Sequence, residues 1–505
     1  MSDAAMDAPT ARNDAAFYDG VIAIAPCAPG YPMLVPGAEL RAAIASAPAS
    51  STEAPRSGPR SDRQECEGGP APDAVNAAIV AAAEALGFHR VAILDVTPPY
   101  DLAAYQTWLN AGLAADMHYL GEPAHLAPRA HPSRLLPTAK TLISVVLAYD
   151  RARHLPSFGN DGRLRGQIAR YAAGTDYHLE MRDRLVALAR AIADRLGVAL
   201  LARPCVDSAP LLERAIAQRG QLGFIGKNTM LITPGLGSFT VLGELLIDLA
   251  ATPTPIAANK AHCGSCTACL TACPTGAFVG PYQLDARACI SYLTIELRGY
   301  VPLAHRAQMG TWIFGCDICQ QVCPYNAGKE PRLPTLAMRD AEHRVPDLER
   351  LVTFGANQLR QFVKRTALRR APREQILRNV AIALGNTGDG AALAPLQRLL
   401  HHARPLVRGH AGWGLGQLAS LCDDPALRET IRETLAAAHA RELTLAMAAP
   451  APLREAEANA AGTAAADASA PDAPSDAPSA AEEIAMAYAR VCDLLGQGRS
   501  ASPIA

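Results

Sequence analysis

The sequence predicts an α/β domain, then a cysteine-rich module, then an α-helical domain. Three observations predict this order. Segments with helical spacing alternate with short apolar runs through about residue 250, eight cysteines fall between residues 263 and 323, and the chain beyond residue 345 is helical in pattern and rich in arginine. Half of the 505 residues are hydrophobic, so two or three domains with sizeable cores can form.

The first part of the chain has the composition of a disordered extension. Residues 1–73 are rich in Ala, Pro, Ser and Gly without a sustained period, and Gly20–Pro26 is the apolar piece with a composition that permits local order. The start is polar and acidic, unlike a secretory signal, and no stretch reaches 18 uncharged apolar residues. We therefore expect a cytoplasmic protein without a membrane span, whose clustered cysteines are metal ligands rather than disulfides.

Residues 74–252 carry the alternation that predicts the α/β domain. The pattern AVNAAIVAAAEALGF has helical spacing and is ended by Gly87, and HRVAILDV after it is strand-like. A helix around Leu102–Ala114, the apolar run TLISVVLAY, a helix over Tyr177–Leu196 and the run VALLARPCV follow in turn. Helices that alternate with short apolar strands are typical of an α/β domain.

The cysteines form two motifs of the bacterial ferredoxin type. The first is C-x2-C-x2-C-x3-C-P from Cys263, the second is C-x2-C-x3-C-P from Cys316, and Cys289 lies between them. Eight thiolates supply four ligands to each of two [4Fe-4S] clusters, and the cysteine before each proline reaches the other cluster. We assign Cys263, Cys266, Cys269 and Cys323 to one cluster, and Cys273, Cys289, Cys316 and Cys319 to the other. Zinc, the alternative, does not explain the x3-Cys-Pro endings. Residues 253–344 are thus predicted to be an inserted two-cluster ferredoxin module.

One carboxylate of the α/β domain stands out. Asp207 follows the strand-like run that ends near residue 205, and carboxylates at strand ends face clefts in open α/β sheets. The alternative is that Asp207 caps a helix beginning at Pro210. Neither interpretation is excluded by the pattern.

The C-terminal part contains a repeat and a basic stretch. RNVAIALGNTGD from Arg378 and GHAGWGLGQLAS from Gly409 are similar at an offset of 31, which is typical of HEAT-like helical repeats and places that domain at residues 345–447. Residues 448–505 read as a low-complexity tail with a short helix over Ala481–Leu495. The basic side chains are Arg360, Lys364, Arg365, Arg369, Arg370, Arg373, Arg378, Arg398, Arg404 and Arg408. Two acidic side chains oppose these ten, so the stretch suits phosphate contacts, and a solvated helical face is the alternative.

Seven segments together carry a resemblance to a known family. They are Arg129-x2-Pro132, RYAAGTDYH, VDSAPLLER, GFIGKN, GSFTVLGELL, CISYLTIELRG and GCDICQQVCPYN. Over roughly residues 74–430 the sequence resembles the epoxyqueuosine reductases. The resemblance implies an oxidoreductase that reduces epoxyqueuosine at the wobble position of tRNA to queuosine and water, with two electrons and two protons. It also implies cobalamin in an α/β domain of the nitroreductase-like reductive-dehalogenase plan, reduced by the two clusters.

The resemblance carries residue roles with it. Asp207 matches the proton donor, and a carboxyl pKa raised by burial would suit that role. The implied cofactor-binding residues are Arg129, Arg170, Asp207, Leu231, Leu242 and Ser291. The implied tRNA-binding residues are Glu296, Arg298, Arg369 and Arg370. Plain alternatives remain for Arg129 as a surface ion-pair partner and for the two leucines as core. We predict no histidine ligand to cobalt, because Met181 stands where the D-x-H-x-x-G pattern from Asp176 requires glycine.

Two other functions compete with this interpretation. A corrinoid reductive dehalogenase shares the two-cluster plan, but usually carries an export signal and has no use for a basic helical domain. A ferredoxin-type electron-transfer subunit explains the cysteines but leaves residues 74–250 without a role. The expected partners are a tRNA carrying epoxyqueuosine and an electron donor protein such as ferredoxin or flavodoxin, and the expected state is a monomer.

Overall fold

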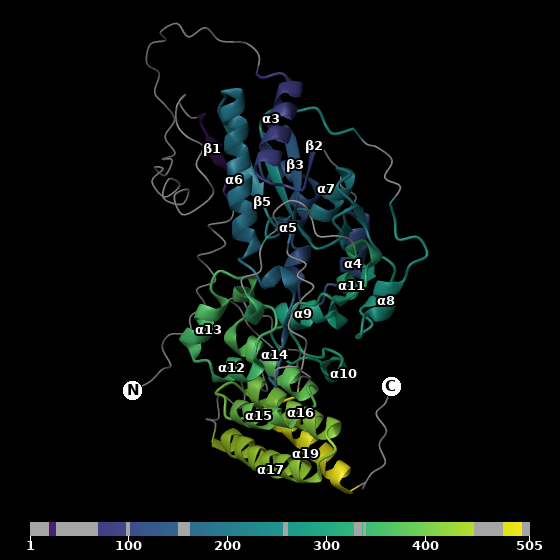
Figure 1. The fold of residues 1–505 in the computed structure, drawn as a ribbon, viewed down its shortest axis with the longest axis vertical. Coiled ribbons are helices and arrows are strands. Elements are labelled where there is room, and N and C mark those ends of the chain that lie inside the picture. Colours follow the sequence, from purple (N-terminus) through teal and green to yellow (C-terminus); the bar gives the residue numbers. More distant parts are fainter. Residues whose placement is uncertain are drawn as a thin grey trace.

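The computed structural model describes residues 20–26, 69–96, 102–149, 162–255, 261–327, 336, 340–448 and 478–496. The described elements are arranged in three parts along the long axis of the molecule (Figure 1). A sheet with helices occupies one end, a module of short helices and hairpins lies beside the middle, and a stack of helices forms the other end. The order matches the three parts that the sequence predicts.

The first part is built on a five-stranded sheet in which every pairing is antiparallel. Across the sheet the strands are β1 (Ile22–Ile24), β5 (Leu200–Cys205), β8 (Thr240–Ile247), β3 (Thr141–Ala148) and β2 (Arg90–Asp95). The strand β3 is buried along its whole length, because helices cover both faces of the sheet. The mixed α/β character agrees with the prediction.

Alternate side chains of β3 pack into two different cores. Ile143 and Val145 join the core beneath α3 (Pro72–Ala85) and α6 (Tyr177–Leu196). Leu142 and Val146 join the core beneath α7 (Glu213–Arg219) on the opposite face. The helix α6 has the predicted bounds, and it ends at Gly197 in the left-handed region, where glycine carries no Cβ penalty. The sheet therefore has an α3/α6 face and an α7 face.

One strand of the sheet comes from the predicted disordered extension. The strand β1 pairs with β5 through Ile22 opposite Ala202 and Ile24 opposite Leu200. Residues 20–26 are thus ordered, in agreement with the apolar composition of Gly20–Pro26 and against the broader prediction for residues 1–73. The rest of that prediction up to residue 68 lies outside the described residues. The pairing makes β1 an edge strand of the sheet, next to β5.

Shorter elements surround the sheet and form the cysteine-rich module. Around the sheet lie α4 (Ala103–Asn110), η1 (His118–Gly121), α5 (Pro123–Ala130), η2 (Pro132–Arg134), β4 (Gln167–Ile168), η3 (Arg170–Ala172), β6 (Phe224–Ile225) and β7 (Leu231–Ile232). The module holds α8 (Ala268–Ala272), β9 (Phe278–Gly280), β10 (Gln283–Leu284), η4 (Ala286–Ala288), α9 (Ile290–Ile295), α10 (Leu303–Arg306), β11 (Trp312–Phe314), α11 (Ile318–Gln321) and η5 (Pro324–Asn326). The strand β11 pairs with β4, which joins the module to the first part.

The third part is a stack of helices. They are η6 (Ala341–His343), α12 (Leu348–Thr353), α13 (Ala356–Val363), η7 (Ala367–Arg370), α14 (Arg373–Asn386), η8 (Gly390–Ala392), α15 (Leu393–Leu399), α16 (Pro405–Leu421), α17 (Pro425–Ala448) and α19 (Ala480–Gly496). The two similar sequence segments lie in α14 and α16, which pack together. A Cβ on Gly385 would lie 2.6 Å from the Cα of Gly414, so the helices touch where neither has a side chain.

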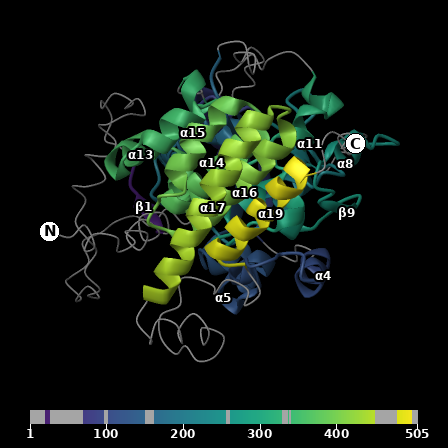
Figure 2. The same cartoon turned by 90° about the horizontal axis from the view of Figure 1, so that it is seen from below.

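The predicted short helix in the tail is present and docked. Viewed from below, α19 lies across α16 and beside α17 (Figure 2). A Cβ on Gly412 of α16 would lie 2.5 Å from Ile484, and one on Gly416 would lie 3.0 Å from Ala487. Glu483 accepts two hydrogen bonds from Arg306 of α10, and both side chains are 1% exposed. Within the described ranges, no helix has the length and apolarity to cross a membrane.

Candidate active site

Asp207 lies in the loop between β5 and α7. The helix α7 begins at Glu213 and its N-cap is Leu212, so the alternative of Asp207 as a helix cap is wrong. The backbone of Asp207 has φ = +39°, in the left-handed region that residues with a Cβ seldom adopt. Such strain in a non-glycine residue is typical of functional sites, where the surroundings enforce it.

Three side chains donate hydrogen bonds to the Asp207 carboxylate. Arg370 Nη1 lies 3.2 Å from Oδ2, His178 Nε2 lies 3.1 Å from the same oxygen, and Tyr177 donates as well. The other ring nitrogen of His178 lies 2.7 Å from Oδ1 of Asp176, which is also the N-cap of α6. The imidazole therefore bridges two carboxylates, one at the start of α6 and one in the loop after β5.

This arrangement makes the pair Asp207–His178 ionic. Burial alone would raise the pKa of Asp207, but the hydrogen bond and charge of His178, the charge of Arg370 and the bond from Tyr177 outweigh it and hold the pKa well below its usual range. Burial alone would lower the pKa of His178, but its bonds to Asp176 and Asp207 raise it to about 9. The predicted raised pKa of Asp207 is therefore wrong for this structure, because three donors surround the carboxylate.

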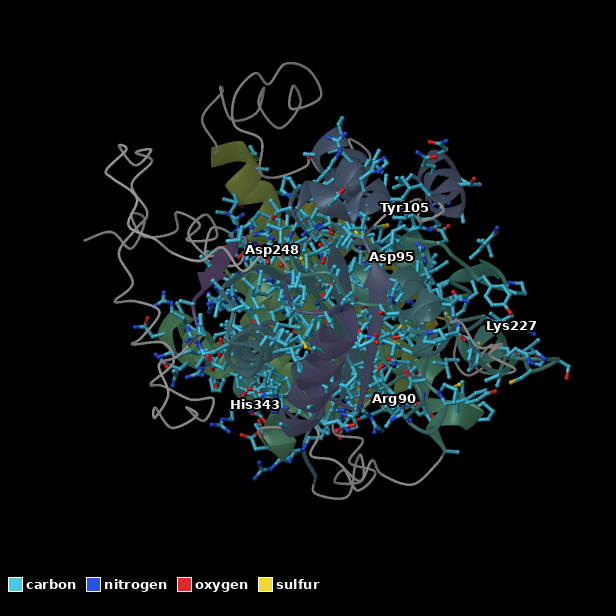
Figure 3. The ribbon with its side chains drawn as sticks, turned by 90° about the horizontal axis from the view of Figure 1, so that it is seen from above. Arg90, Asp95, Tyr105, Lys227, Asp248 and His343 are labelled. Atoms are coloured by element: carbon cyan, nitrogen blue, oxygen red, sulfur yellow. The ribbon has the colours of Figure 1, made fainter. Side chains whose placement is uncertain are left out.

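A second wall of the site comes from α4, η1 and α5. Tyr119 of η1 lies close enough to Glu296, Arg370, Asp207 and Arg129 for their charges to act on its phenol; burial comes first among the causes that raise its pKa to about 12. The Arg129 guanidinium lies 5.4 Å from the ring centre of Tyr105 and donates to the His125 carbonyl at 2.8 Å. Tyr105 is labelled in Figure 3. Arg129 is 8% exposed, so it is no surface ion-pair partner.

Two of the predicted tRNA-binding residues join Asp207 through Arg370. Glu296 Oε1 lies 4.0 Å from Arg370 Nη2, and Arg298 donates to Gln375 Oε1 and, at 3.4 Å, to the Arg370 carbonyl. Glu296 and Arg298 follow α9 directly, so the cysteine module contributes to the site. The structure thus brings the module, η7 and the loop after β5 together.

The basic stretch divides into exposed and buried side chains. Arg378 is fully buried and donates to the carbonyls of residues 293, 297 and 299, and Arg408 is buried in an ion pair with Glu442 at 2.6 Å. These two arginines hold helices together, so the prediction that they face phosphates is wrong. Arg373 is half-buried, and the exposed members are Arg360, Lys364, Arg365, Arg369, Arg370, Arg398 and Arg404. The Arg365 carbonyl accepts from the Asp176 N–H at 2.7 Å, which ties the basic segment 364–370 to the start of α6.

Four predicted cofactor-binding residues lie on nearby elements. Arg170 follows β4; its backbone N–H donates to Asp317 Oδ2 at 3.0 Å, and its guanidinium lies 4.9 Å from the ring centre of Phe239. Ser291 lies in α9, two residues after Cys289. The remaining two are Leu231 in β7, a buried member of the core on the α7 face, and Leu242 in β8, a partly exposed neighbour of that core.

The eight predicted cluster ligands gather in two groups. The charge on Cys269 interacts with Cys263 and Cys323, and that on Cys323 interacts with Cys263 and Cys266. Cys266 is exposed. Lys227, labelled in Figure 3, donates from Nζ to the Gly264 and Cys266 carbonyls at 2.8 and 2.9 Å. These are the four cysteines of the first predicted ligand set.

The second group is more enclosed. The charge on Cys316 interacts with Cys289 and Cys273, and that on Cys319 interacts with Cys316, Cys289 and also Cys269 of the first group. The two groups are therefore neighbours. Among the described residues no three His, Cys, Asp or Glu side chains converge on a single metal ion, whereas the thiolates of a cubane surround four irons. The ligand assignment itself stays a prediction.

Sequence reasoning missed several polar residues of the site. Tyr177 and His178 belong to the segment RYAAGTDYH, but Asp207, the partner of His178, lies 29 residues further along the chain. Glu244 is a lone acid in the apolar strand β8 and is fully buried there, a signal that the pattern does offer. Glu213 Oε1 accepts from the Asp207 backbone N–H at 2.6 Å, which no pattern indicates.

Comparison with known proteins gives the family. Residues 129–208 match the family model described as "Epoxyqueuosine reductase QueG, DUF1730", and residues 262–326 match the "4Fe-4S double cluster binding domain". Epoxyqueuosine reductase from Xanthomonas campestris pv. campestris is 40% identical over 354 residues, which cover 68% of this chain and 97% of the relative. The Escherichia coli epoxyqueuosine reductase is 37% identical over 341 residues, covering 66% and 86%.

Solved structures agree with the sequence relatives. An epoxyqueuosine reductase with an epoxyqueuosine-modified tRNA-Tyr stem loop matches with a TM-score of 0.67 and 29% identity over 83% of this chain and 99% of that chain. A Bacillus subtilis epoxyqueuosine reductase, whose catalytic aspartate loop is swung out of the active site, matches with a TM-score of 0.62 and 32% identity over 72% and 94%. The chain therefore belongs to the epoxyqueuosine reductase family.

Proposed function

We propose that this chain reduces epoxyqueuosine in tRNA to queuosine, with Asp207 as the group that delivers a proton to the epoxide oxygen. The observation that carries the proposal is the placement of Asp207. It stands between a protonated His178 and Arg370, and Arg370 belongs to the exposed basic segment 364–370. A carboxylate joined to a proton source and bordered by cations suits a substrate that is both an epoxide and part of a polyanion.

The residues present fit the cofactors that the family implies. Two neighbouring groups of four thiols fit two [4Fe-4S] clusters in number and ligand type. For cobalamin, the charged and polar side chains of Arg129, Tyr119 and Glu296 around Asp207 suit its amide groups, and the partly exposed Leu242 offers apolar contact. Bound there, cobalamin would supply the two-electron reduction of the epoxide.

The position of the two thiol groups suggests the direction of electron flow. Cys266 of the first group is exposed, so an electron donor protein such as ferredoxin or flavodoxin would meet that group first. Asp317, between two cysteines of the second group, accepts from the Arg170 backbone N–H and lies 3.2 Å from Arg344. The contact with Arg170, a predicted cofactor-binding residue, favours a position of the second group on the side of the catalytic domain. We propose a monomer as the working unit.

The chain's own residues handle the proton and the tRNA. At rest the proton sits on His178 Nε2, 3.1 Å from Asp207 Oδ2. As negative charge develops on the leaving oxygen, the proton of His178 passes to Asp207 Oδ2 and from there to that oxygen, which leaves His178 neutral and Asp207 ionised again. Asp176 stabilises the imidazolium and fixes the ring orientation, as a carboxylate does for any catalytic histidine. Arg369 and the other exposed cations of segment 364–370 hold the phosphates.

An assay with defined components tests the proposal. The protein is purified without oxygen and reconstituted with iron, sulfide and cobalamin, and a chemical reductant and a tRNA containing epoxyqueuosine are added. Conversion to queuosine that requires cobalamin is the expected result. Bound cobalamin without conversion would point to another corrinoid reaction. Eight irons with no bound corrin would leave an electron-transfer module.

A further inference from the structure

Two acids near Asp207, Glu213 and Glu244, have no part in the proton delivery described above. Glu244 is fully buried near the middle of β8, where it stands opposite Ser144 of β3 and Cys205 of β5. The Ser144 hydroxyl donates to Glu244 Oε1 at 3.2 Å. Glu213 is half-buried as the first residue of α7, on the same face of the sheet. A lone acid in the centre of an apolar strand is costly and needs an explanation.

Glu213 and Glu244 act on each other through their charges. Burial comes first among the causes that raise both pKa values, to about 8 for Glu244 and well above the usual range for Glu213, where the charge of Glu244 adds to it. Both acids therefore ionise at a higher pH than an exposed glutamate.

The second contact of Glu213 leads to Asp207. Glu213 Oε1 accepts from the Asp207 backbone N–H at 2.6 Å, a short bond of the charge-assisted kind. That N–H belongs to the residue whose φ is +39°. A left-handed aspartate persists only where surrounding contacts enforce it. The Glu213 carboxyl bonds the strained backbone of Asp207, whereas Tyr177, His178 and Arg370 bond its side chain.

We propose that Glu213 is a positioning residue whose carboxyl, through its hydrogen bond with the Asp207 backbone N–H, latches the Asp207 loop in its catalytic position. The proposal rests on the proposed function, in which Asp207 must reach the epoxide oxygen. In the Bacillus subtilis relative the catalytic aspartate loop has been observed swung out of the active site, so such a loop has a second position to be held against. The latch keeps the inward position populated.

The latch depends on pH through several charged neighbours. The titratable groups that act on Glu213 or its partner are Glu244 of β8, Cys205 of β5, Tyr177 and His178 of α6, Asp207 of the loop and Arg214 of α7. As the pH rises, both acids ionise and the negative charges of Glu213 and Glu244 repel each other. We therefore expect the hold on the Asp207 loop to weaken at high pH.

Replacement of Glu213 by alanine and by glutamine tests the latch in the full-length reconstituted enzyme. In Glu213→Ala the acceptor for the Asp207 N–H is gone, whereas glutamine keeps an oxygen that can accept from that N–H. Glu84→Ala, which removes an exposed acid from α3, is the matched control. We expect kcat on epoxyqueuosine tRNA to fall tenfold or more in Glu213→Ala, in keeping with the roughly 100-fold cost of a small misplacement. KM for tRNA should change less than twofold, and Glu213→Gln should restore kcat to within about threefold.

A second readout is independent of the reaction. Hydrogen exchange of the Asp207 backbone amide, measured without substrate, should accelerate about tenfold in Glu213→Ala and remain protected in Glu213→Gln. If Glu213→Ala does not fold, Glu213→Asp replaces it in the comparison with Glu213→Gln. The aspartate side chain is shorter by one methylene, so its carboxyl oxygen lies further from the Asp207 N–H.

Three outcomes would overturn the latch: unchanged exchange at Asp207, unchanged kcat in Glu213→Ala, or an equal loss in alanine and glutamine variants. A wild-type enzyme that fails to convert epoxyqueuosine would overturn the proposed function instead, and the exchange result would still decide the latch.

Discussion

Asp207 carries a charge at rest because Arg370, His178 and Tyr177 all donate to it. A carboxylate in that state delivers a proton only if a neighbour resupplies it, and His178, with a pKa raised to about 9 by its bonds to two carboxylates against the opposing effect of burial, holds one throughout the neutral range. The catalytic unit that we propose is therefore the chain Asp176–His178–Asp207, and the single acid that the sequence predicts is its terminal member.

Replacement of Asp207 by asparagine should stop turnover and leave the cofactors bound. Asparagine keeps the shape but cannot carry a proton to the leaving oxygen, so we expect kcat to fall by about 10²- to 10⁴-fold. Nucleoside analysis of the tRNA and measurement of iron and cobalt per chain give the two readouts. Asp95→Asn, at the exposed end of β2 in Figure 3, is the control. Unchanged turnover in Asp207→Asn would remove Asp207 as the proton donor.

Glu244 should make the stability of the protein depend on pH. Its pKa is raised above the ordinary 4.5 to about 8, chiefly by burial. The folded state therefore binds the proton more tightly than the unfolded chain, and this stabilisation is complete below about pH 4.5 and is lost as the pH rises to about 8. In Glu244→Gln the unfolding temperature should fall less over that interval than in the wild type. An identical fall in both proteins would contradict the assignment, and Glu84→Gln is the control.

At the scale of single residues, the sequence predicts those residues whose role follows from their spacing along the chain. The two ferredoxin motifs are spaced around a cluster, and Asp207 follows a strand end. It does not predict that His178, Glu213 or Glu244 matters, because their contacts join residues on α6, α7 and β8 that only the folded sheet brings together. The burial of Arg378 and Arg408 is equally invisible, since exposed and buried arginines look alike in a basic stretch.

Among the elements, the segment 364–370 with η7 is the one that joins the helical part to the active site. Its Arg365 carbonyl bonds the start of α6, Arg370 bonds Asp207, and the charge of Arg369 acts on Asp176. An element that touches both catalytic carboxylates and presents exposed cations can set the distance between bound phosphates and the reacting base. The buried Arg378 on α14 fixes this geometry through three carbonyls of the cysteine module.

Charge reversal at Arg369 should weaken tRNA binding without disabling Asp207. Arg369→Glu removes a cation from the exposed segment and leaves the Arg370–Asp207 bond in place. We expect the slope of log K against log salt concentration to fall by about one for each phosphate that the variant no longer neutralises. Binding of the tRNA stem loop at several salt concentrations gives the slope. Arg195→Glu, exposed at the opposite end of α6, is the matched control. An unaltered slope would exclude Arg369 from phosphate binding.

The sequence predicts most elements of the sheet and the helical part, including α6 with its bounds, because periodicity and caps are local. It does not predict the strand order or that every pairing is antiparallel, since both depend on which edges meet in space. The docking of β1 onto β5 is hidden for the same reason: three apolar residues in a low-complexity segment acquire meaning only beside an open edge.

Over the whole molecule, the predicted cluster ligands follow one another along the chain, and Cys266 of the first group is exposed. In the predicted assignment the second group takes one ligand, Cys289, from outside both motifs, next to the helix α9 that leads to Glu296 and Arg298. Under that assignment, loss of Cys289 should affect the second cluster alone. The domain boundaries that the sequence predicts remain predictions, because Arg378 and β11 tie the parts into shared cores.

Replacement of Cys289 by serine should separate the two clusters. We expect iron per chain to fall from eight towards about four, because one cluster loses a thiolate and the other keeps all of its own. Electron paramagnetic resonance of the reduced protein and iron analysis give the readout, and Cys422→Ser, far along the chain in the helical part, is the control. Retention of eight irons would refute the ligand assignment.

The glycine-lined face of α16 has a consequence for how the chain is made. Gly409, Gly412 and Gly416 let α19 lie close, but each glycine weakens an isolated helix by about 1 kcal/mol relative to alanine. During synthesis α16 leaves the ribosome well before α19. The glycine-lined face of α16 is therefore uncovered, and the helix is weak, until α19 is released. We therefore expect the earlier parts to fold during synthesis and the C-terminal stack to close only after translation has passed residue 496.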